Sequence, residues 1–285
     1  MRLVPVACAL LIVLAGCGGV MDTPTSTPTA TESEATPTLP DSLSVIGGEL
    51  PVDPAPVFVR ILNMTDQRVD SPVVYVESPN ESSPNILDRR QSSFRTALGF
   101  VPPERSNDSG GVRLGAYTPA DGNSVHLYEG LTRNATATES TLAHEFVHTV
   151  QFQTGWASEM WNSQPTINNE LTYDSWQAYY LLLEGSAQYV EYRYQQQFLP
   201  DSPSQAAWRT GAYENASAYV RLNLARYTLG AAYVAEEIDS PAGIESLYTE
   251  PPKSTEQILH HTDDRLEPLT VNHYDSGNWT VTEES

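Results

Sequence analysis

The chain has 285 residues, a formal net charge of −21 and a single lysine, Lys253. A surface this acidic would repel the phosphates of nucleic acid and the headgroups of anionic lipid, which argues against a nucleic-acid-binding protein. The length allows one sizeable hydrophobic core, so we expect one folded domain with a non-globular N-terminus.

The charge composition also indicates the salt concentration to which the protein surface is adapted. Arginine is retained while lysine is nearly absent, and acidic residues outnumber basic ones by 36 to 15. In about 1 M salt the Debye length shrinks to about 3 Å, so repulsion between neighbouring carboxylates is screened. We therefore expect a halophilic protein, and an acidic extracellular protein without salt adaptation stays open as the alternative.

The N-terminus follows the plan of a signal peptide over residues 1–16. A basic start at Arg2 precedes an apolar run that is too short to be a good membrane span. Leu-Ala-Gly-Cys at 14–17 resembles a lipobox, which implies that Cys17 becomes the lipidated first residue of an exported lipoprotein on the outer face of the cell membrane. The alternative is an ordinary signal peptide in which Cys17 is incidental.

Residues 17–50 form the second segment. Much of it consists of Thr, Pro, Ser and Glu, a composition that cannot repay the conformational entropy of folding. We expect a disordered stalk between the lipid anchor and one domain over residues 51–285. Asn-x-Ser/Thr sequons suit a surface glycoprotein, and we expect roughly half of them to be used. They lie at Asn63, Asn80, Asn107, Asn134, Asn215 and Asn278.

The first half of the domain reads mainly as strands. Residues 57–62 and 73–77 are rich in β-branched and aromatic side chains and are bounded by Pro and Asp, which predicts strands. Residues 125–128 alternate between apolar and polar and predict a further short strand. Between 86 and 98 the apolar residues are spaced for a helix.

The second half reads as helices. The apolar spacing predicts one helix over about 139–153, a second over about 173–198 and a third over about 208–238. Strands early and helices late indicate an α+β fold with a small N-terminal sheet and C-terminal helices.

The first of these helices carries the pattern His-Glu-x-x-His. His144 and His148 lie one turn apart on one face, so both imidazoles can reach a single ion. Zinc accepts such ligands, and a catalytic zinc keeps one position for water. Glu145, between them, is placed to take a proton from that water. The alternative is a polar patch on an amphipathic helix, which the apolar flanking residues disfavour.

A third ligand must come from farther along the chain. Glu184 is our candidate, because it is an isolated carboxylate in an apolar helical stretch, where a cation would remove the cost of burying it. Pairing of Glu184 with Arg193 or Arg221 is the alternative, and Glu170 is the rival ligand. This places the metal site within residues 140–190.

Gly185 follows the candidate ligand inside a predicted helix. Glycine costs about 1 kcal/mol relative to alanine there, so the position needs a packing reason. We expect this helix to approach the helix of His144 closely at Gly185.

These elements together resemble the gluzincin metallopeptidases, in which two histidines and a downstream glutamate hold zinc. The resemblance implies a zincin-like (thermolysin-like) metallopeptidase domain, with an active-site helix beneath a small sheet whose edge strand pairs with an extended peptide; we assign residues 125–128 to that edge. More narrowly, five segments resemble a family of secreted or surface-anchored, thermolysin-like metalloproteins of archaea and some bacteria: 115–119, 142–151, 184–187, 227–230 and 251–260.

The resemblance also directs attention to two further positions. Gluzincins often place an acidic residue one turn after the third ligand to orient the first histidine, and this chain has Gln188 there, whose amide oxygen adds no charge. His260 stands where gluzincins use a His or Tyr to stabilise the oxyanion, with a surface histidine as the alternative. Ser254 and Gln257 form a capping box before it.

The sequence therefore predicts a cell-surface lipoprotein with a Zn²⁺-dependent peptide hydrolase domain that acts on peptide or protein substrates. It would meet the membrane through its N-terminal lipid alone and would not bind nucleic acid. The alternative is a zincin-fold surface binding or structural lipoprotein with weak or absent catalysis, which Gln188 and the unidentified oxyanion donor motivate. The oligomeric state is left open.

Overall fold

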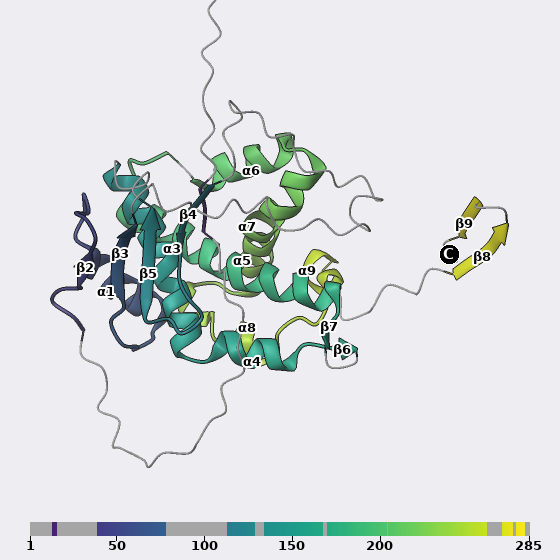
Figure 1. Ribbon diagram of the computed structural model, residues 1–285, viewed down its shortest axis with the longest axis horizontal. Helices are drawn as coiled ribbons and strands as arrows, with labels where there is room; N and C mark the ends of the chain where they lie inside the picture. The colour runs from purple at the N-terminus through teal and green to yellow at the C-terminus, as the bar shows by residue number, and fades with distance from the viewer. Residues whose placement is uncertain are drawn as a thin grey trace, which may run out of the picture.

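The computed structural model describes residues 13–15, 39–77, 113–128, 134–167, 170–203, 205–260, 270–275 and 278–282. These residues form a helix-rich α+β fold in which a small sheet lies beside a group of helices (Figure 1). The predicted helix over 86–98 and the predicted lipid attachment at Cys17 fall outside the described residues.

The main sheet is mixed, and its strands stand in the order β1-β4-β5-β3-β2. β4 and β5 pair antiparallel, and the other neighbours pair parallel. The strand predicted over 125–128 is present as β5, but its assignment to the edge is wrong, because β4 and β3 satisfy its backbone groups on both sides. The strand bounds are β1 Val13–Ala15, β2 Val45–Ile46, β3 Val73–Glu77, β4 Arg113–Tyr117 and β5 Ser124–Tyr128.

The two outer strands come from the N-terminal segments. β1 lies inside the predicted signal peptide and pairs with β4. β2 lies inside residues 17–50, which the composition assigned to the stalk, and it pairs with β3, so the last part of that segment belongs to the sheet. If the predicted signal peptide were removed, β1 would be lost and β4 would become the edge strand.

Residues 57–62, predicted as a strand, belong instead to helix α1 (Pro54–Thr65). Asp53 caps the helix by accepting a hydrogen bond from the Ala55 amide at 3.0 Å, and proline at the first position suits a helix start. The β-branched content was misleading, because the buried side chains follow a helical period. They are Val57, Phe58, Ile61 and Leu62.

The helices predicted over 139–153 and 173–198 are confirmed as α3 (Ala135–Gln153) and α5 (Tyr173–Phe198). Each has a side-chain cap: the Ala137 amide donates to the Asn134 side chain and the Ser175 amide donates to the Thr172 hydroxyl, both at 3.0 Å. A short helix, α4 (Trp156–Ser163), separates them after Gly155, whose φ of 84° is a backbone conformation that glycine adopts without strain.

The single helix predicted over 208–238 is wrong, because the chain forms α6 (Gln205–Asn215) and α7 (Ala218–Glu237) there. Ser217 separates them and caps α7 by accepting from the Val220 amide. The remaining elements are short: β6 (Thr166–Ile167), β7 (Glu170–Leu171), the 3-10 turn η3 (Pro241–Gly243), α8 (Ser246–Thr249), α9 (Thr255–His260), β8 (Thr270–Asp275) and β9 (Asn278–Thr282).

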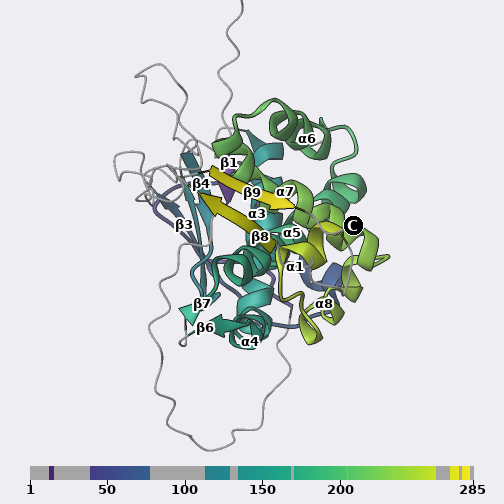
Figure 2. The same ribbon diagram turned by 90° about the vertical axis from the view of Figure 1, so that its right-hand side faces the viewer.

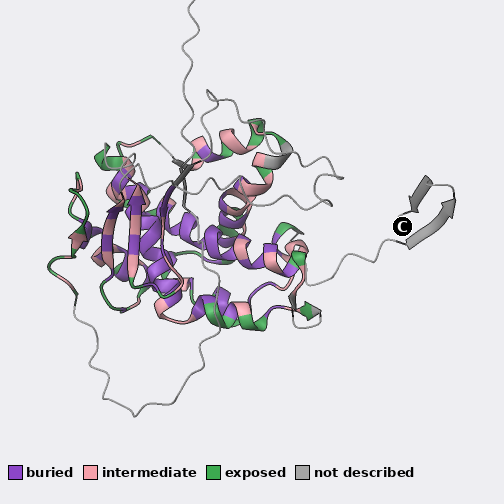
Figure 3. Ribbon diagram, viewed as in Figure 1, coloured by how far each residue is buried: buried purple, intermediate pink, exposed green. Residues whose placement is uncertain are grey.

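The hydrophobic core lies between one face of the sheet and the helices. Figure 2 shows the sheet from its side with the helices gathered on one face, and buried residues concentrate where α3 and α5 face the sheet (Figure 3). Val125 and Leu127 of β5 pack into the same core as Phe146 of α3 and Leu182 of α5. In the described ranges, no helix has the length and apolarity needed to cross a membrane.

α5 and α7 touch backbone to backbone at two glycines. A Cβ on Gly185 would stand 2.3 Å from the carbonyl carbon of Gly230, and a Cβ on Gly230 would stand 2.0 Å from the Leu181 carbonyl oxygen. The expected packing reason for Gly185 is therefore real, but the partner helix is α7 rather than the helix of His144. The crossing fixes the helix that carries Glu184.

Because the two helices are in backbone contact, adding one methyl group at Gly185 should destabilise the fold. Gly185→Ala should lower the free energy of unfolding by about 1–3 kcal/mol or more, because backbone atoms cannot yield as a flexible side chain would. Gly211→Ala in α6 is the matched control, since its Cβ meets no described atom within 4 Å, and it should gain about 1 kcal/mol from helix propensity. Denaturant unfolding of both variants measures this, and equal stabilities would contradict it.

Candidate metal centre

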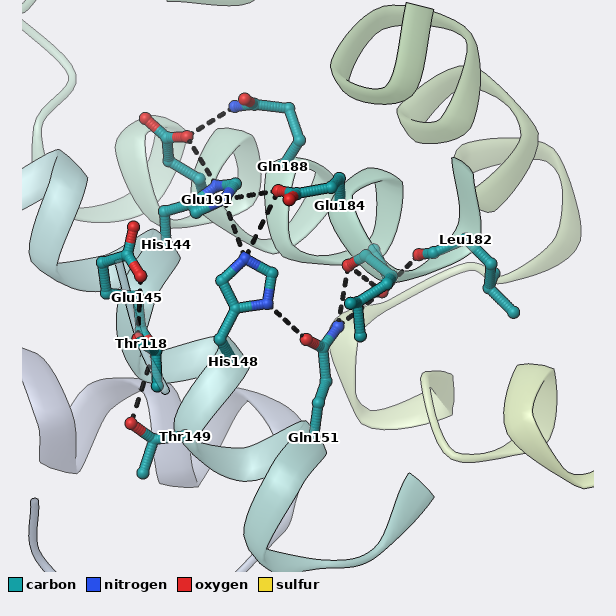
Figure 4. A network of polar contacts seen from close by, with 12 residues as sticks. Thr118, His144, Glu145, His148, Thr149, Gln151, Leu182, Glu184, Gln188 and Glu191 are labelled. Carbon is teal, nitrogen blue, oxygen red and sulfur yellow. Dashed lines mark hydrogen bonds and ion pairs between the residues drawn. The ribbon is translucent and has the colours of Figure 1, made fainter. Parts of the chain in front are cut away.

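Four buried side chains with polar ends come together below the sheet. α3 places His144, Glu145 and His148 on its inner side, and α5 brings Glu184 against them (Figure 4). Each of these four residues is at most 1% exposed. The sequence separates Glu184 from His148 by more than 30 residues, so the packing of α3 against α5 creates this group.

Three of the four residues offer a ligand atom to one point. His144 Nε2 lies 3.2 Å from His148 Nε2, and these nitrogens lie 3.5 and 3.4 Å from Glu184 Oε2. Ligand atoms bound about 2.0–2.1 Å from a tetrahedral zinc ion lie about 3.3–3.4 Å apart. The spacing therefore fits one small cation, and the three predicted ligands form a group that could hold it.

In the described residues, the ion pairs of the Glu184 carboxylate are with the two histidines. Its Oε2 atom has no hydrogen bond from any described residue. Burial alone would raise the pKa of Glu184, but the contacts with His144 and His148 hold it well below its ordinary value. The predicted alternative of an arginine partner is wrong, because Arg193 bonds Gln196 and Arg221 bonds backbone carbonyls of residues 213–216.

A glutamine on the same helix orients His148. The Gln151 amide nitrogen donates to the Leu183 carbonyl at 3.0 Å and lies 2.8 Å from Ser186 Oγ and from the Tyr248 hydroxyl. A carbonyl can only accept, so the Gln151 oxygen must face His148 Nδ1, which lies 2.6 Å away. His148 then carries its proton on Nδ1, and the Nε2 lone pair points at the common centre.

Glu191, not the predicted Gln188, takes the orienting position beside His144. His144 Nδ1 lies 3.3 Å from Glu191 Oε2, an ion-pair distance whose geometry falls short of a hydrogen bond. Gln188 turns away from the histidine and donates to the same Glu191 oxygen at 2.5 Å. Arg209 of α6 also lies 3.8 Å from that oxygen. A charged carboxylate thus replaces the neutral amide that the sequence suggested.

The neighbours of Glu191 favour its ionised form, although the side chain is buried. Burial favours the neutral acid, but the contacts with His144, Arg209 and Ser140 outweigh it and lower the pKa of Glu191. The same neighbourhood raises the pKa of His144 to about 9, because contacts with Glu184 and Glu191 outweigh the effect of burial, which alone would lower it. One sequence signal could have found Glu191: it follows Glu184 by two helical turns and shares its face.

Glu145 differs from the three ligand residues in its contacts. One carboxylate oxygen accepts a hydrogen bond from Thr118 Oγ1 at 2.7 Å, and the other has no hydrogen-bond partner in the described part of the chain. Burial raises the pKa of Glu145, while the neighbouring imidazoles oppose the rise. Thr118 directly follows β4, so the sheet positions the carboxylate at one atom and leaves the other available.

The other two predicted site positions, Glu170 and His260, lie in described elements. The side chains of Glu170 in β7 and His260 in α9 fall outside the described residues. α9 packs through Ile258 against Leu181 of α5. The predicted capping box is formed in part: the Gln257 backbone amide donates to Ser254 Oγ at 3.3 Å, while the Gln257 side chain accepts from the Lys253 backbone amide and not from that of Ser254.

Comparisons with known proteins identify no relative of the chain. No protein-family description, no curated protein and no solved structure matches the chain. The assignment of a metal centre therefore rests on the geometry of the side chains.

The network around His144 predicts a measurable role for Glu191. Glu191→Gln removes the negative charge but keeps the shape, so we expect affinity for zinc to fall about 10- to 100-fold, the usual cost of losing such a partner. Gln197→Ala, on the exposed side of α5, should leave the affinity unchanged. Competition with a chromophoric chelator measures both, and equal affinities would show that Glu191 does not orient the ligand.

Proposed function

We propose that the chain is an exported lipoprotein whose folded domain is a zinc-dependent peptide-bond hydrolase with a gluzincin-type ligand set. The observation that carries the proposal is the convergence of His144, His148 and Glu184 on one point, with Glu145 beside them. Export and attachment to the outer face of the cell membrane through Cys17 rest on the lipobox-like N-terminus.

The donor set favours zinc over the commoner hard cations. Two imidazole nitrogens and one carboxylate oxygen suit zinc, whereas calcium and magnesium prefer six or more oxygen ligands. Three protein ligands leave a fourth position, which is the pattern of catalytic rather than structural zinc sites. When bound, such an ion supplies a Lewis acid that acidifies a water molecule and polarises a carbonyl oxygen.

In this proposal, Glu145 moves the proton. Its raised pKa brings it closer to neutral pH, which suits a group that must both take and return a proton. Thr118 holds Oε2, and Oε1 is the atom that receives the proton from the attacking water and passes it to the leaving amine. His144 and His148 stay fixed because Glu191 and Gln151 hold their outer nitrogens.

The substrate we propose is an extended peptide laid along β4. Thr118 joins this strand to the carboxylate of Glu145, so a chain paired with β4 would run beside the site. β1 pairs with the outer edge of β4, with Val13 opposite Arg113 and Ala15 opposite Ala116. This pairing supports the proposal that β4 can bind an extended segment. Removal of the predicted signal peptide would expose the edge of β4, and a peptide could then bind there through main-chain hydrogen bonds.

One observation favours a second function, a surface binding or structural lipoprotein that keeps the ion without efficient catalysis. His144, Glu145, His148 and Glu184 are all at most 1% exposed. A peptide bond can reach them only if the covering elements move apart, whereas an ion that only stabilises the fold needs no opening. Turnover therefore separates the two functions.

The test is the variant Glu145→Gln, assayed with a broad peptide library in high salt. We expect it to keep one zinc ion per chain and to lose about 10²–10⁴-fold in kcat, because the amide cannot act as a base. Glu159→Gln, an exposed glutamate of α4, is the charge-matched control and should keep full activity. Full activity of Glu145→Gln would refute the mechanism, and zinc binding without any cleavage by the unsubstituted protein would favour the binding function.

A further inference from the structure

A second polar cluster lies on the opposite face of the sheet. Val125 and Leu127 of β5 face the helices, so Ser124 and His126, which alternate with them along the strand, project from the other face. β3 pairs parallel with β5 and brings Glu77 to the same face. None of these side chains belongs to the metal centre, which lies on the helical side.

The hydrogen bonds in this cluster run in one direction. His126 Nδ1 lies 2.6 Å from Glu77 Oε1, and His126 Nε2 lies 3.1 Å from Ser124 Oγ. In the neutral imidazole, the Glu77 carboxylate accepts the proton of Nδ1, so Nε2 carries the lone pair and Ser124 donates its hydroxyl proton to it. This is the order of contacts in a Ser-His-acid triad, which is recognised by geometry and not by sequence position.

Two tyrosines hold the imidazole in this orientation. The ring of His126 stacks on Tyr75 of β3 at 4.8 Å between centroids and on Tyr117 of β4 at 4.5 Å, with interplanar angles of 12° and 10°. A ring held on both faces cannot rotate out of the line between Ser124 and Glu77. The side chains of His126 and Glu77 are still 17% and 24% exposed, so the cluster is open to solvent.

We propose that Ser124, His126 and Glu77 form a second, metal-independent site that transfers activated acyl groups. Ser124 Oγ forms a bond to the acyl carbon while His126 Nε2 takes the hydroxyl proton. The bond from that carbon to the leaving oxygen breaks, and the proton moves from Nε2 to the leaving group. A water molecule then bonds to the acyl carbon while His126 Nε2 takes its proton. The bond from that carbon to Ser124 Oγ breaks, the proton moves from Nε2 to Oγ, and the acid leaves.

The acyl donor must be activated because the cluster supplies a nucleophile and a base only. A single oxyanion-hole donor is worth about 10²–10³ in kcat, and none is built into the three side chains. An aryl ester or thioester, with its good leaving group, needs less of this stabilisation than an amide. The site would therefore be distinct from the proposed peptidase in both chemistry and substrate.

The test is covalent labelling of the full chain with a fluorophosphonate probe, read by mass spectrometry. We expect one label per chain on the peptide that contains Ser124, with no label in Ser124→Ala and at least a 100-fold slower rate in His126→Gln. Ser246→Ala, an exposed serine whose hydroxyl bonds the Gly243 carbonyl, should be labelled like the unsubstituted chain. A chelator should leave the rate unchanged, so the result does not depend on the metal centre.

Glu77 acts through His126 and is tested as a positioning residue. Glu77→Gln should slow labelling at least tenfold at unchanged thermal stability, and Glu77→Asp should restore part of the rate, which a purely structural pair would not do. The proposal is overturned if the unsubstituted chain takes no label, if Ser124→Ala keeps it, if His126→Gln reacts at the original rate, or if a chelator abolishes labelling.

Discussion

The structure depends on the burial of one carboxylate between two imidazoles. Glu184 is 1% exposed, and its inner oxygen has only His144 and His148 near it among the described residues. A buried charge without hydrogen bonds costs several kcal/mol, and one divalent ion in the common centre would remove that cost for the carboxylate and would order both rings.

The surroundings hold the ligands from several directions. The Gly185–Gly230 contact brings the backbones of α5 and α7 together and so fixes the position of α5, the helix that carries Glu184. Gln151 ties His148 to α5 and to Tyr248 of α8, and Glu191 links His144 to Arg209 of α6. These partners come from distant parts of the chain, and a change in any of them would alter the orientation of a candidate ligand. The sheet contributes through Thr118, which fixes one oxygen of Glu145.

Local patterns in the sequence predicted which three residues, His144, His148 and Glu184, come together, and long-range packing decided the rest. Residues four apart on a helix must share a face, so His144 and His148 could be paired from spacing alone, and an isolated carboxylate in an apolar run marked Glu184. Propensity misled for α1, whose β-branched residues form a helix begun by Asp53 and Pro54. The order of the strands, the partner of Gly185 and the role of Glu191 depend on contacts that no local pattern encodes.

The most direct test of the account is the coordination shell of the bound metal. Zinc-edge X-ray absorption on the protein loaded with one equivalent of zinc should show two nitrogen ligands and at least one oxygen ligand, all at about 2.0–2.1 Å. Conversion of Glu184 to glutamine should remove or lengthen one oxygen contribution while both imidazoles stay. Failure to bind zinc, or a shell without imidazole, would contradict the claim that these three side chains enclose the ion.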